Sequence, residues 1–174
     1  MTTDLSDPTA AIVKVLRDTY VGSSEIKTVY DSDPDLIATD EMPCITVEKQ
    51  SDSSTYGSTG YIDVTEQIMI KVIINKADDW EETTDHEQHA MKRLRALVER
   101  RDPSDPRAYA QGTIRHTLTN RLEAAGVAIS AAVRTEYGVD PSRGEEFLTA
   151  EAHLTVEVSY SMKSPTRSIH PIGY

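Results

Sequence analysis

The chain contains very few of the residues that mark disulfide, metal or membrane architectures. Its 174 residues include one cysteine, one tryptophan and one phenylalanine, and aromatic residues make up 6% of the total. The single cysteine, Cys44, excludes an intramolecular disulfide framework and a cysteine-based zinc site. No apolar run approaches the roughly 18 residues that a membrane-spanning helix requires. Residues Met1–Pro8 are polar and acidic, so we expect no signal peptide and synthesis in a reducing host cytoplasm.

Basic residues are also scarce. The chain has 18 Lys and Arg against 29 Asp and Glu, a formal net charge of −11, which disfavours binding to nucleic acid phosphates or anionic membranes. The acidic excess lies in residues 1–90, with 6 basic and 19 acidic residues, whereas residues 91–174 carry 12 and 10. Two interpretations stay open. Either an acidic surface of one copy meets a basic helix of the next, or the acidic side chains form a solvated surface, as in the proteins of a salt-adapted host.

No motif with catalytic or metal-binding chemistry is complete. His86–His89 has its two histidines three residues apart, whereas a zinc protease helix needs them four apart. Asp31–Asp35 starts like a calcium loop, but Leu36 and Met42 stand where glycine and glutamate are required. There is no nucleophile elbow and no glycine loop that would cradle a phosphate. We therefore expect no enzyme, no catalytic residue, no cofactor and no metal site.

Two long strands with alternating polarity dominate the sequence, Tyr61–Asn75 and Glu151–Met162. In the second strand apolar and polar residues alternate throughout, which predicts one apolar and one polar face. In the first strand Glu66 interrupts the apolar face, so it should mark a bulge, a bend or the point where the strand leaves the core. Helices must cover the apolar faces. The polar face is left for water, a partner subunit or a lumen.

The rest of the pattern predicts three helices and further strands. Asp7 with Pro8 predicts a helix start, and Thr84 with Glu87 forms a capping box for a basic helix. The expected elements are helices over residues 8–20, 84–101 and 113–125, strands over 26–30, 44–49, 61–75, 127–137 and 151–162, a linker over 102–107, and a polar hairpin loop over about 50–60.

This order predicts an α+β fold with two layers. We expect a mostly antiparallel β-sheet covered on one face by two or three helices, with a long β-hairpin. A chain of 174 residues is long enough for one domain with its own core, which we place over residues 1–162. Residues 163–174 contain two prolines and form a C-terminal arm, either disordered or docked on a neighbouring copy.

The element order resembles that of the tail terminator (tail completion) proteins of long-tailed bacteriophages and archaeal viruses. The features that carry the resemblance are an N-terminal helix, the strand entry Pro43–Val47, a polar hairpin tip, the long strand Tyr61–Asn75, a helix, and two closing strands with a short C-terminal arm. The resemblance covers nearly the whole chain as patterning, without a diagnostic motif. The linker over 102–107 and the helix over 113–125 have no matched counterpart in it.

The resemblance implies a structural virion protein without enzymatic activity. It would form a homohexameric ring in the neck region of the tail, cap the tail tube and join it to head-side connector or adaptor proteins. Genomic DNA would pass through the lumen without specific binding, because an acidic wall repels its backbone. The alternatives are another neck ring (a head-completion or head–tail connector protein), a tail tube subunit and, outside virions, a small cytosolic binding module or hydrolase.

The ring hypothesis singles out two sets of residues. Candidates for facing the tube or lumen, or for contacting a partner, lie on the hairpin and the two long strands: Tyr56, Glu66, Glu151, His153 and Glu157. Candidates for the subunit interface lie on the basic helix and the C-terminal arm: Arg93, Arg95, Arg100, Arg101, Ile169 and Tyr174. Neighbouring copies are expected to join through strand edges and helix faces.

Overall fold

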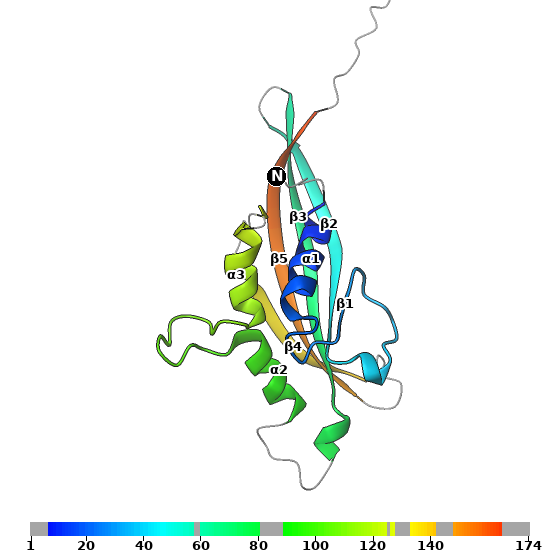
Figure 1. Ribbon diagram of the computed structural model, residues 1–174. Helices are drawn as coiled ribbons and strands as arrows, with labels where there is room; N and C mark the ends of the chain where they lie inside the picture. The colour runs from blue at the N-terminus through cyan, green and yellow to red at the C-terminus, as the bar shows by residue number, and fades with distance from the viewer. Residues whose placement is uncertain are drawn as a thin grey trace, which may run out of the picture.

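Three helices, five strands and two short 3-10 turns make up the described part of the chain. The computed structural model describes residues 7–57, 60–80, 89–124, 126–127, 133–141 and 148–164, and for residues 78, 80 and 124 the backbone only. In chain order the elements are α1 (Pro8–Tyr20), β1 (Thr28–Tyr30), a 3-10 turn (Thr39–Glu41), β2 (Cys44–Tyr56), β3 (Tyr61–Asn75), a second 3-10 turn (Ala77–Trp80), α2 (Ala90–Glu99), α3 (Ile114–Ala124), β4 (Arg134–Asp140) and β5 (Thr149–Lys163) (Figure 1).

The strands form one sheet in the order β1-β2-β3-β5-β4. β1 runs parallel to β2, and the other neighbouring strands are antiparallel. Buried side chains of all three helices pack against the same face of this sheet. The predicted α+β fold, with a mostly antiparallel sheet covered by helices on one face, is therefore confirmed.

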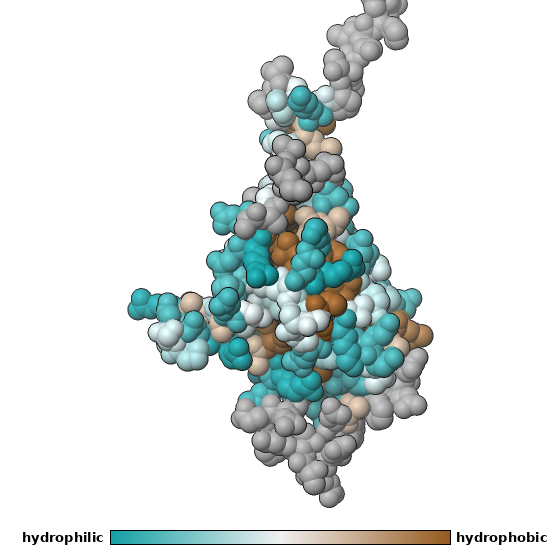
Figure 2. Space-filling model, viewed as in Figure 1, coloured by the Kyte–Doolittle hydropathy of each residue, from teal (hydrophilic) through white to brown (hydrophobic). Residues whose placement is uncertain are grey.

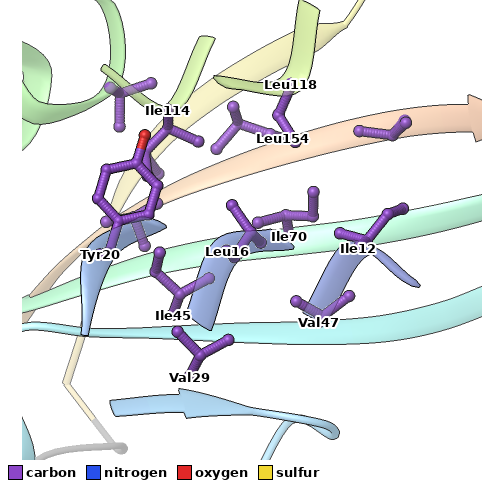
Figure 3. Close-up of a cluster of buried hydrophobic side chains, with 14 of the residues drawn as sticks. Ile12, Leu16, Tyr20, Val29, Ile45, Val47, Ile70, Ile114, Leu118 and Leu154 are labelled. Carbon is purple, nitrogen blue, oxygen red and sulfur yellow. The ribbon is translucent and has the colours of Figure 1, made fainter. Parts of the chain in front are cut away.

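The core lies between the helices and the alternate residues of the sheet that point toward them. Isoleucine, leucine and valine side chains fill it, as the low aromatic content indicates. Figure 3 shows the side chains that meet there: Ile12, Leu16 and Tyr20 of α1, Ile114 and Leu118 of α3, and Val29, Ile45, Val47, Ile70 and Leu154 of the sheet.

α1 begins and ends as its sequence predicts. The Asp7 carboxylate accepts a hydrogen bond from the Ala10 N–H at 3.0 Å, and Pro8 occupies the first turn. Gly22 follows the helix with a φ of +80°, a conformation that glycine adopts without steric cost. At the last turn, the hydroxyls of Tyr20 and Thr117 share a hydrogen bond of 2.7 Å, which joins α1 to α3 inside the core.

α2 begins later than the helix predicted over residues 84–101 and ends at Glu99, two residues before the predicted end. His89 is already outside the helix, which begins at Ala90, whose N–H donates to Asp79 Oδ1 at 2.8 Å. At the other end, Arg100 leaves the helical conformation, and its carbonyl accepts from the Ala110 N–H at 2.8 Å. The capping box of Thr84 and Glu87 lies outside the described residues, as does His86.

α3 confirms the helix predicted near residues 113–125, and Gly126 follows it with a φ of +84°. The strand start predicted at Val127 is wrong, because the Val127 N–H donates to the Leu122 carbonyl at 2.9 Å and closes the helix instead. β4 covers Arg134–Asp140 and pairs with β5 up to its last residue. Residues 128–132 lie outside the described residues.

β2 continues through the segment predicted to be a loop over about 50–60. Its pairing with β3 extends to Tyr56 opposite Ile62, with a register shift between Lys49 and Ser51. The physical reason is that β3 offers unpaired backbone groups along its whole length, and residues 51–56 satisfy them. Gln50 has no residue opposite it on β3, so it forms a bulge in β2. The bulge that Glu66 could have marked in β3 therefore lies in the neighbouring strand.

The second face of the sheet is not open along its whole length. The connection between β1 and β2, residues 31–43, lies across one end of it and forms a second small core: Ile37, Met42, Cys44 and Ile73, with Tyr30 against them. The prediction that this face is left for water or a partner is wrong at this end. Cys44 is buried there, as expected.

β5 runs one residue past the predicted end of the last strand, to Lys163. The N–H of Ser164 then donates to the Gly60 carbonyl at 2.8 Å, beside the β2–β3 connection. The remaining residues of the predicted C-terminal arm, 165–174, lie outside the described residues. Within the described ranges, no helix has the length and apolar character needed to cross a membrane.

Ile70→Ala should lower the free energy of unfolding by about 2–5 kcal/mol, because deleting a buried side chain leaves a cavity. Ile70 is fully buried in the core, whereas Ser53 is exposed on β2. Urea unfolding followed by circular dichroism measures the loss, with Ser53→Ala as the control, for which we expect about 0.5 kcal/mol or less. Equal losses in the two variants would contradict the packing described above.

Candidate functional site

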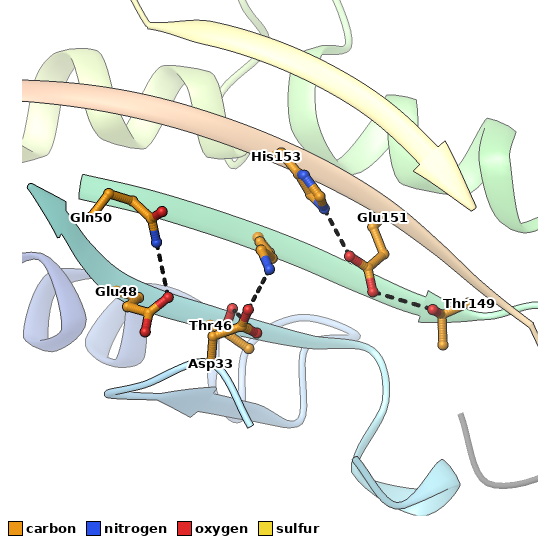
Figure 4. A network of polar contacts seen from close by, with 8 residues as sticks. Asp33, Thr46, Glu48, Gln50, Thr149, Glu151 and His153 are labelled. Atoms are coloured by element: carbon orange, nitrogen blue, oxygen red, sulfur yellow. Dashed lines mark hydrogen bonds and ion pairs between the residues drawn. The ribbon is translucent and has the colours of Figure 1, made fainter. Parts of the chain in front are cut away.

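At the covered end of the second face of the sheet, an ion pair and several side-chain hydrogen bonds hold the β1–β2 connection and β5 in place. Lys71 of β3 pairs with Asp33 of the β1–β2 connection, and Thr46 of β2 donates to the same carboxylate at 3.3 Å (Figure 4). Only 17% of the Lys71 side chain and 12% of the Asp33 side chain are exposed. The pair therefore holds the connection against the sheet, and the Asp33 carboxylate already has two partners inside the chain.

Glu151 and His153 lie next to this pair on β5 (Figure 4). The Glu151 carboxylate accepts from Thr149 Oγ1 at 3.3 Å and contacts His153 Nε2 at 2.8 Å. The Glu151 side chain is 2% exposed and that of His153 is 36% exposed. Of these two predicted contact residues, Glu151 is thus buried and orients the imidazole, and only His153 reaches the surface.

The other half of the second face is uncovered. It begins where Glu157 of β5 lies opposite Gln67 of β3, and continues along Ser159 and Ser161. Glu157 is half-buried, and Gln67 and both serines are exposed. This open face is polar and carries no basic side chain on β5 before Lys163, so it matches the wet surface that the alternating pattern predicts.

Glu66 lies on the helix-covered face of β3, where the apolar core ends. It is 5% exposed, and its Oε1 accepts from Lys49 Nζ at 3.1 Å and from the Tyr160 hydroxyl at 2.7 Å. Lys49 also pairs with Asp52 at 2.6 Å. Hydrogen bonds to Asp52 and Glu66 raise the pKa of Lys49. The Glu66 carboxylate, predicted to face a tube, lumen or partner, is thus enclosed by groups of its own chain.

Beyond Glu66 the sheet continues as a three-stranded projection, which we call the β-arm: residues 51–56 of β2, 61–65 of β3 and 159–163 of β5 (Figure 1). On the same side as Glu66, Tyr56, Ile62 and Met162 lie next to one another across the three strands. Tyr56 is 83% exposed and Met162 is 49% exposed. The end of the β-arm therefore presents an exposed apolar row, with the predicted contact residue Tyr56 in it.

Arginines and tyrosines lie close together near β4, the strand at the edge of the sheet opposite β1. The Arg95 guanidinium lies 5.4 Å from the ring centroid of Tyr137, and Arg101 and Arg115 lie 4.4 and 5.4 Å from that of Tyr109. Such stacking attracts a cation to the ring face and fixes its orientation. The basic helix has no aromatic residue of its own, and the fold supplies both rings from other segments.

The four predicted interface arginines that the structure describes have different surroundings. Arg93 Nη2 pairs with Glu25 Oε2 at 2.7 Å within its own chain, beside a hollow of about 560 Å³ next to the β1–β2 connection. Arg95, Arg100 and Arg101 are exposed. The other two candidates, Ile169 and Tyr174, lie outside the described residues.

Sequence reasoning missed the contacts that join distant segments. Asp33 and Lys71 are 38 residues apart in the chain, and Tyr109 contacts Arg101 only because residues 100–110 fold back on themselves. The hydrogen bond between Tyr160 and Glu66 could have been predicted from the sequence, because both residues lie on the apolar faces of their strands. Among the described residues, no group of three His, Cys, Asp or Glu side chains could hold a metal ion.

Glu66→Ala should lower the free energy of unfolding by roughly 1–3 kcal/mol, because Lys49 and the Tyr160 hydroxyl lose their common acceptor. Glu66→Gln retains an amide oxygen for Tyr160 and should lose less. Urea unfolding of the two variants at neutral pH tests this. Equal losses would contradict a role for the charge, and an unchanged alanine variant would contradict a role for the whole network.

Stability should fall as the pH rises through about 10 to 12. Burial and the hydrogen bond to Glu66 raise the pKa of Tyr160 from 10.0 to about 12, and burial raises the pKa of Tyr20 to about 12. Folding thus favours the neutral phenols, and this contribution is fully present below pH 10 and is lost as the pH passes 12. Melting temperatures measured over this range should fall less steeply for Tyr160→Phe, and an identical slope would contradict the assignment.

No model of a protein family matches this chain, and no curated protein matches it. The role of the surfaces described above is therefore inferred from their geometry and charge.

Proposed function

We propose that the chain is a structural protein of a virion, a tail terminator that forms a ring on the end of the tail tube. In this role a homohexamer caps the tube, stops its growth and binds the head-side connector or adaptor proteins in the neck region. Genomic DNA passes through the lumen without specific binding. The protein then acts through its surfaces and catalyses no reaction.

The observation that carries this proposal is the β-arm with its open strand edges. β1 pairs with β2 only up to Thr46, and β4 pairs with β5 only up to Thr155. Among the described residues, β2 from Val47 and β5 from Val156 onward therefore have no strand on their outer sides. Unpaired backbone groups at such edges accept a strand of another chain. In a ring both edges can be paired, because the outer edge of β2 in one copy faces one neighbour and the outer edge of β5 faces the other.

The exposed groups on the β-arm fit contacts with other proteins and a water-filled channel. Tyr56 and Met162 are large apolar side chains at its end, where a tube or connector subunit would bury them. On the opposite side, Ser159 and Ser161 of the β-arm continue the polar surface of Gln67 and Glu157, which a lumen tolerates without exposing apolar groups. The net charge of −11 agrees with a wall that does not retain DNA.

A tail tube subunit is the second candidate, and the same open edges favour it. A continuous sheet around a lumen serves a tube as well as a ring, and the two roles differ in what the purified chain does. A tube subunit polymerises into long tubes, whereas a terminator stops at a closed ring.

The test combines negative-stain electron microscopy of the purified chain with a capping assay on growing tail tubes of the same virus. We expect closed rings of about six copies, the number that the resemblance to tail terminators implies; closed rings are the common form of soluble homo-oligomers. Adding them should shorten the tubes. Long tubes formed by the chain alone would support the tube subunit, and neither rings nor any effect on tube length would contradict the proposal.

Variants of the β-arm tip separate capping from folding. Tyr56→Ser and Met162→Ser should abolish capping, while the free energy of unfolding changes by about 0.5 kcal/mol or less because both side chains are exposed. Val21→Ser is the matched control, since Val21 is an exposed apolar residue (41%) far from the β-arm in the fold. Capping that survives the β-arm variants would contradict a contact through Tyr56 and Met162.

A further inference from the structure

One side of the molecule carries a group of arginines, which we call the basic side: Arg95, Arg100, Arg101, Arg107 and Arg115. Arg95 lies over the ring of Tyr137, and Arg101 and Arg115 lie over the ring of Tyr109. A guanidinium that is already fixed on a ring loses less conformational freedom when it binds a carboxylate. The basic side is therefore prepared to bind acidic groups.

The loop between α2 and α3 extends this basic side away from the body (Figure 1). The two sides of this loop are joined by backbone hydrogen bonds, from Asp102 N–H to the Ala108 carbonyl at 3.0 Å and from Ala110 N–H to the Arg100 carbonyl at 2.8 Å. The side chain of Asp105 accepts from the Arg107 N–H at 3.0 Å. A loop with this many internal bonds holds a fixed shape, and its surface is mainly hydrophilic (Figure 2).

The aspartates of the loop offset only part of its charge. Asp102 Oδ1 accepts from both the N–H and the hydroxyl of Ser104, at 2.8 and 2.6 Å. Both aspartates thus serve to shape the turns. Arg101 and Arg107 are exposed on the same loop, and Arg95 and Arg100 add to the positive charge at its base.

The opposite side carries a surface of complementary charge, which we call the acidic connection: the exposed residues Asp31, Asp35, Leu36, Asp40 and Glu41. Leu36 is 66% exposed among these carboxylates. The segment is fixed in place by the burial of Ile37 and by the Asp33–Lys71 pair. An exposed apolar side chain in a segment rich in carboxylates suits a protein–protein contact, where apolar groups at the centre exclude water and polar groups at the rim favour a particular partner.

The fold places these two surfaces at opposite edges of the sheet. The acidic connection follows β1, the first strand in the sheet order, and Tyr137 of the basic side belongs to β4, the last. Four strand spacings, roughly 19 Å, separate these edges. Figure 1 shows the loop of the basic side on the left and the acidic connection on the right. Surfaces that complement each other from opposite sides join copies head to tail, and such contacts form a ring where the rotation between neighbouring copies closes.

We propose that the acidic connection of one copy docks on the basic side of the next, and that this contact orders the copies around the ring. The inference rests on the proposed function in that it names the contact by which the ring closes. A nucleic acid is the competing partner for the arginines. The net charge of −11 repels its phosphates, whereas a second copy of the chain supplies carboxylates and an apolar centre.

Neutralising variants test the contact by light scattering after size exclusion in low salt. The first variant is R101Q with R107Q, the second is D35N with D40N, and the control is K14Q with D18N, an exposed pair on α1. We expect each of the first two to raise the dissociation constant roughly tenfold or more, since charged rim contacts govern such docking. The control should assemble like the wild type.

A mixture of the two variants gives the sharpest result. Each keeps one intact surface, so an equimolar mixture should form heterodimers and stop there, whereas neither variant alone forms dimers at that concentration. Rings from either variant alone, a mixture without heterodimers, or a wild type that stays monomeric at millimolar concentration would overturn the contact. Binding of a labelled DNA duplex by the wild type, lost in R101Q with R107Q, would overturn it in favour of a nucleic acid.

This contact and the proposed function fail in different ways. Rings that depend on both charged surfaces but do not stop tube growth would leave the contact standing and remove the terminator role. Rings that stop tube growth but assemble equally well from the neutralised variants would leave the terminator role standing and remove the contact.

Discussion

The antiparallel pairing of β3 with β5, from Asn75 opposite Thr149 to Tyr61 opposite Lys163, is the constraint on which the rest of the structure depends. Because side chains alternate along a strand, this register decides which residues face the helices and which face away. Ile70 and Leu154 then lie side by side on the helical face, and Gln67 and Glu157 on the other. A slip of one residue would exchange the two faces, so both the core and the polar face of the sheet depend on this one alignment.

The same pairing extends farther than the core that supports it. The apolar side chains of the helical face are buried as far as Ile68 on β3, and Glu66 then ends the core with its bonds to Lys49 and Tyr160. Past this row the strands pair without covering helices, and the β-arm exposes Tyr56 and Met162. A buried carboxylate costs free energy unless it is paired, and Glu66 has such partners at the row where the helix-covered core ends and the exposed β-arm begins.

The sequence predicts the parts of the fold that depend on local periodicity. α1, α3, β3 and β5 follow from spacing, caps and alternation, and their positions agree with the structure to within a few residues. The extension of β2 could not be predicted in this way, because a serine-rich segment becomes a strand only when β3 lies beside it. The start of α2 depends on Asp79, and the burial of Glu151 depends on neighbouring segments of the sheet face.

The candidate surface residues also fall into two groups, those whose exposure follows from local pattern and those buried by distant segments. His153, Glu157 and Tyr56 reach the surface because alternation and hairpin geometry place them there. Glu66 and Glu151 are enclosed by groups that are distant in the chain, and the two tyrosines under the arginines come from segments outside the basic helix. Local patterns thus identify faces, and only the packed structure decides which charged groups on a face are already neutralised.

Hydrogen–deuterium exchange of the assembled and dispersed protein tests most directly whether the β-arm is an assembly surface. The account predicts that amides on the outer edges of β2 (residues 47–56) and β5 (residues 156–163) become protected when rings form, while α3 exchanges alike in both states. Equal exchange of both edges in the assembled and dispersed protein would contradict it.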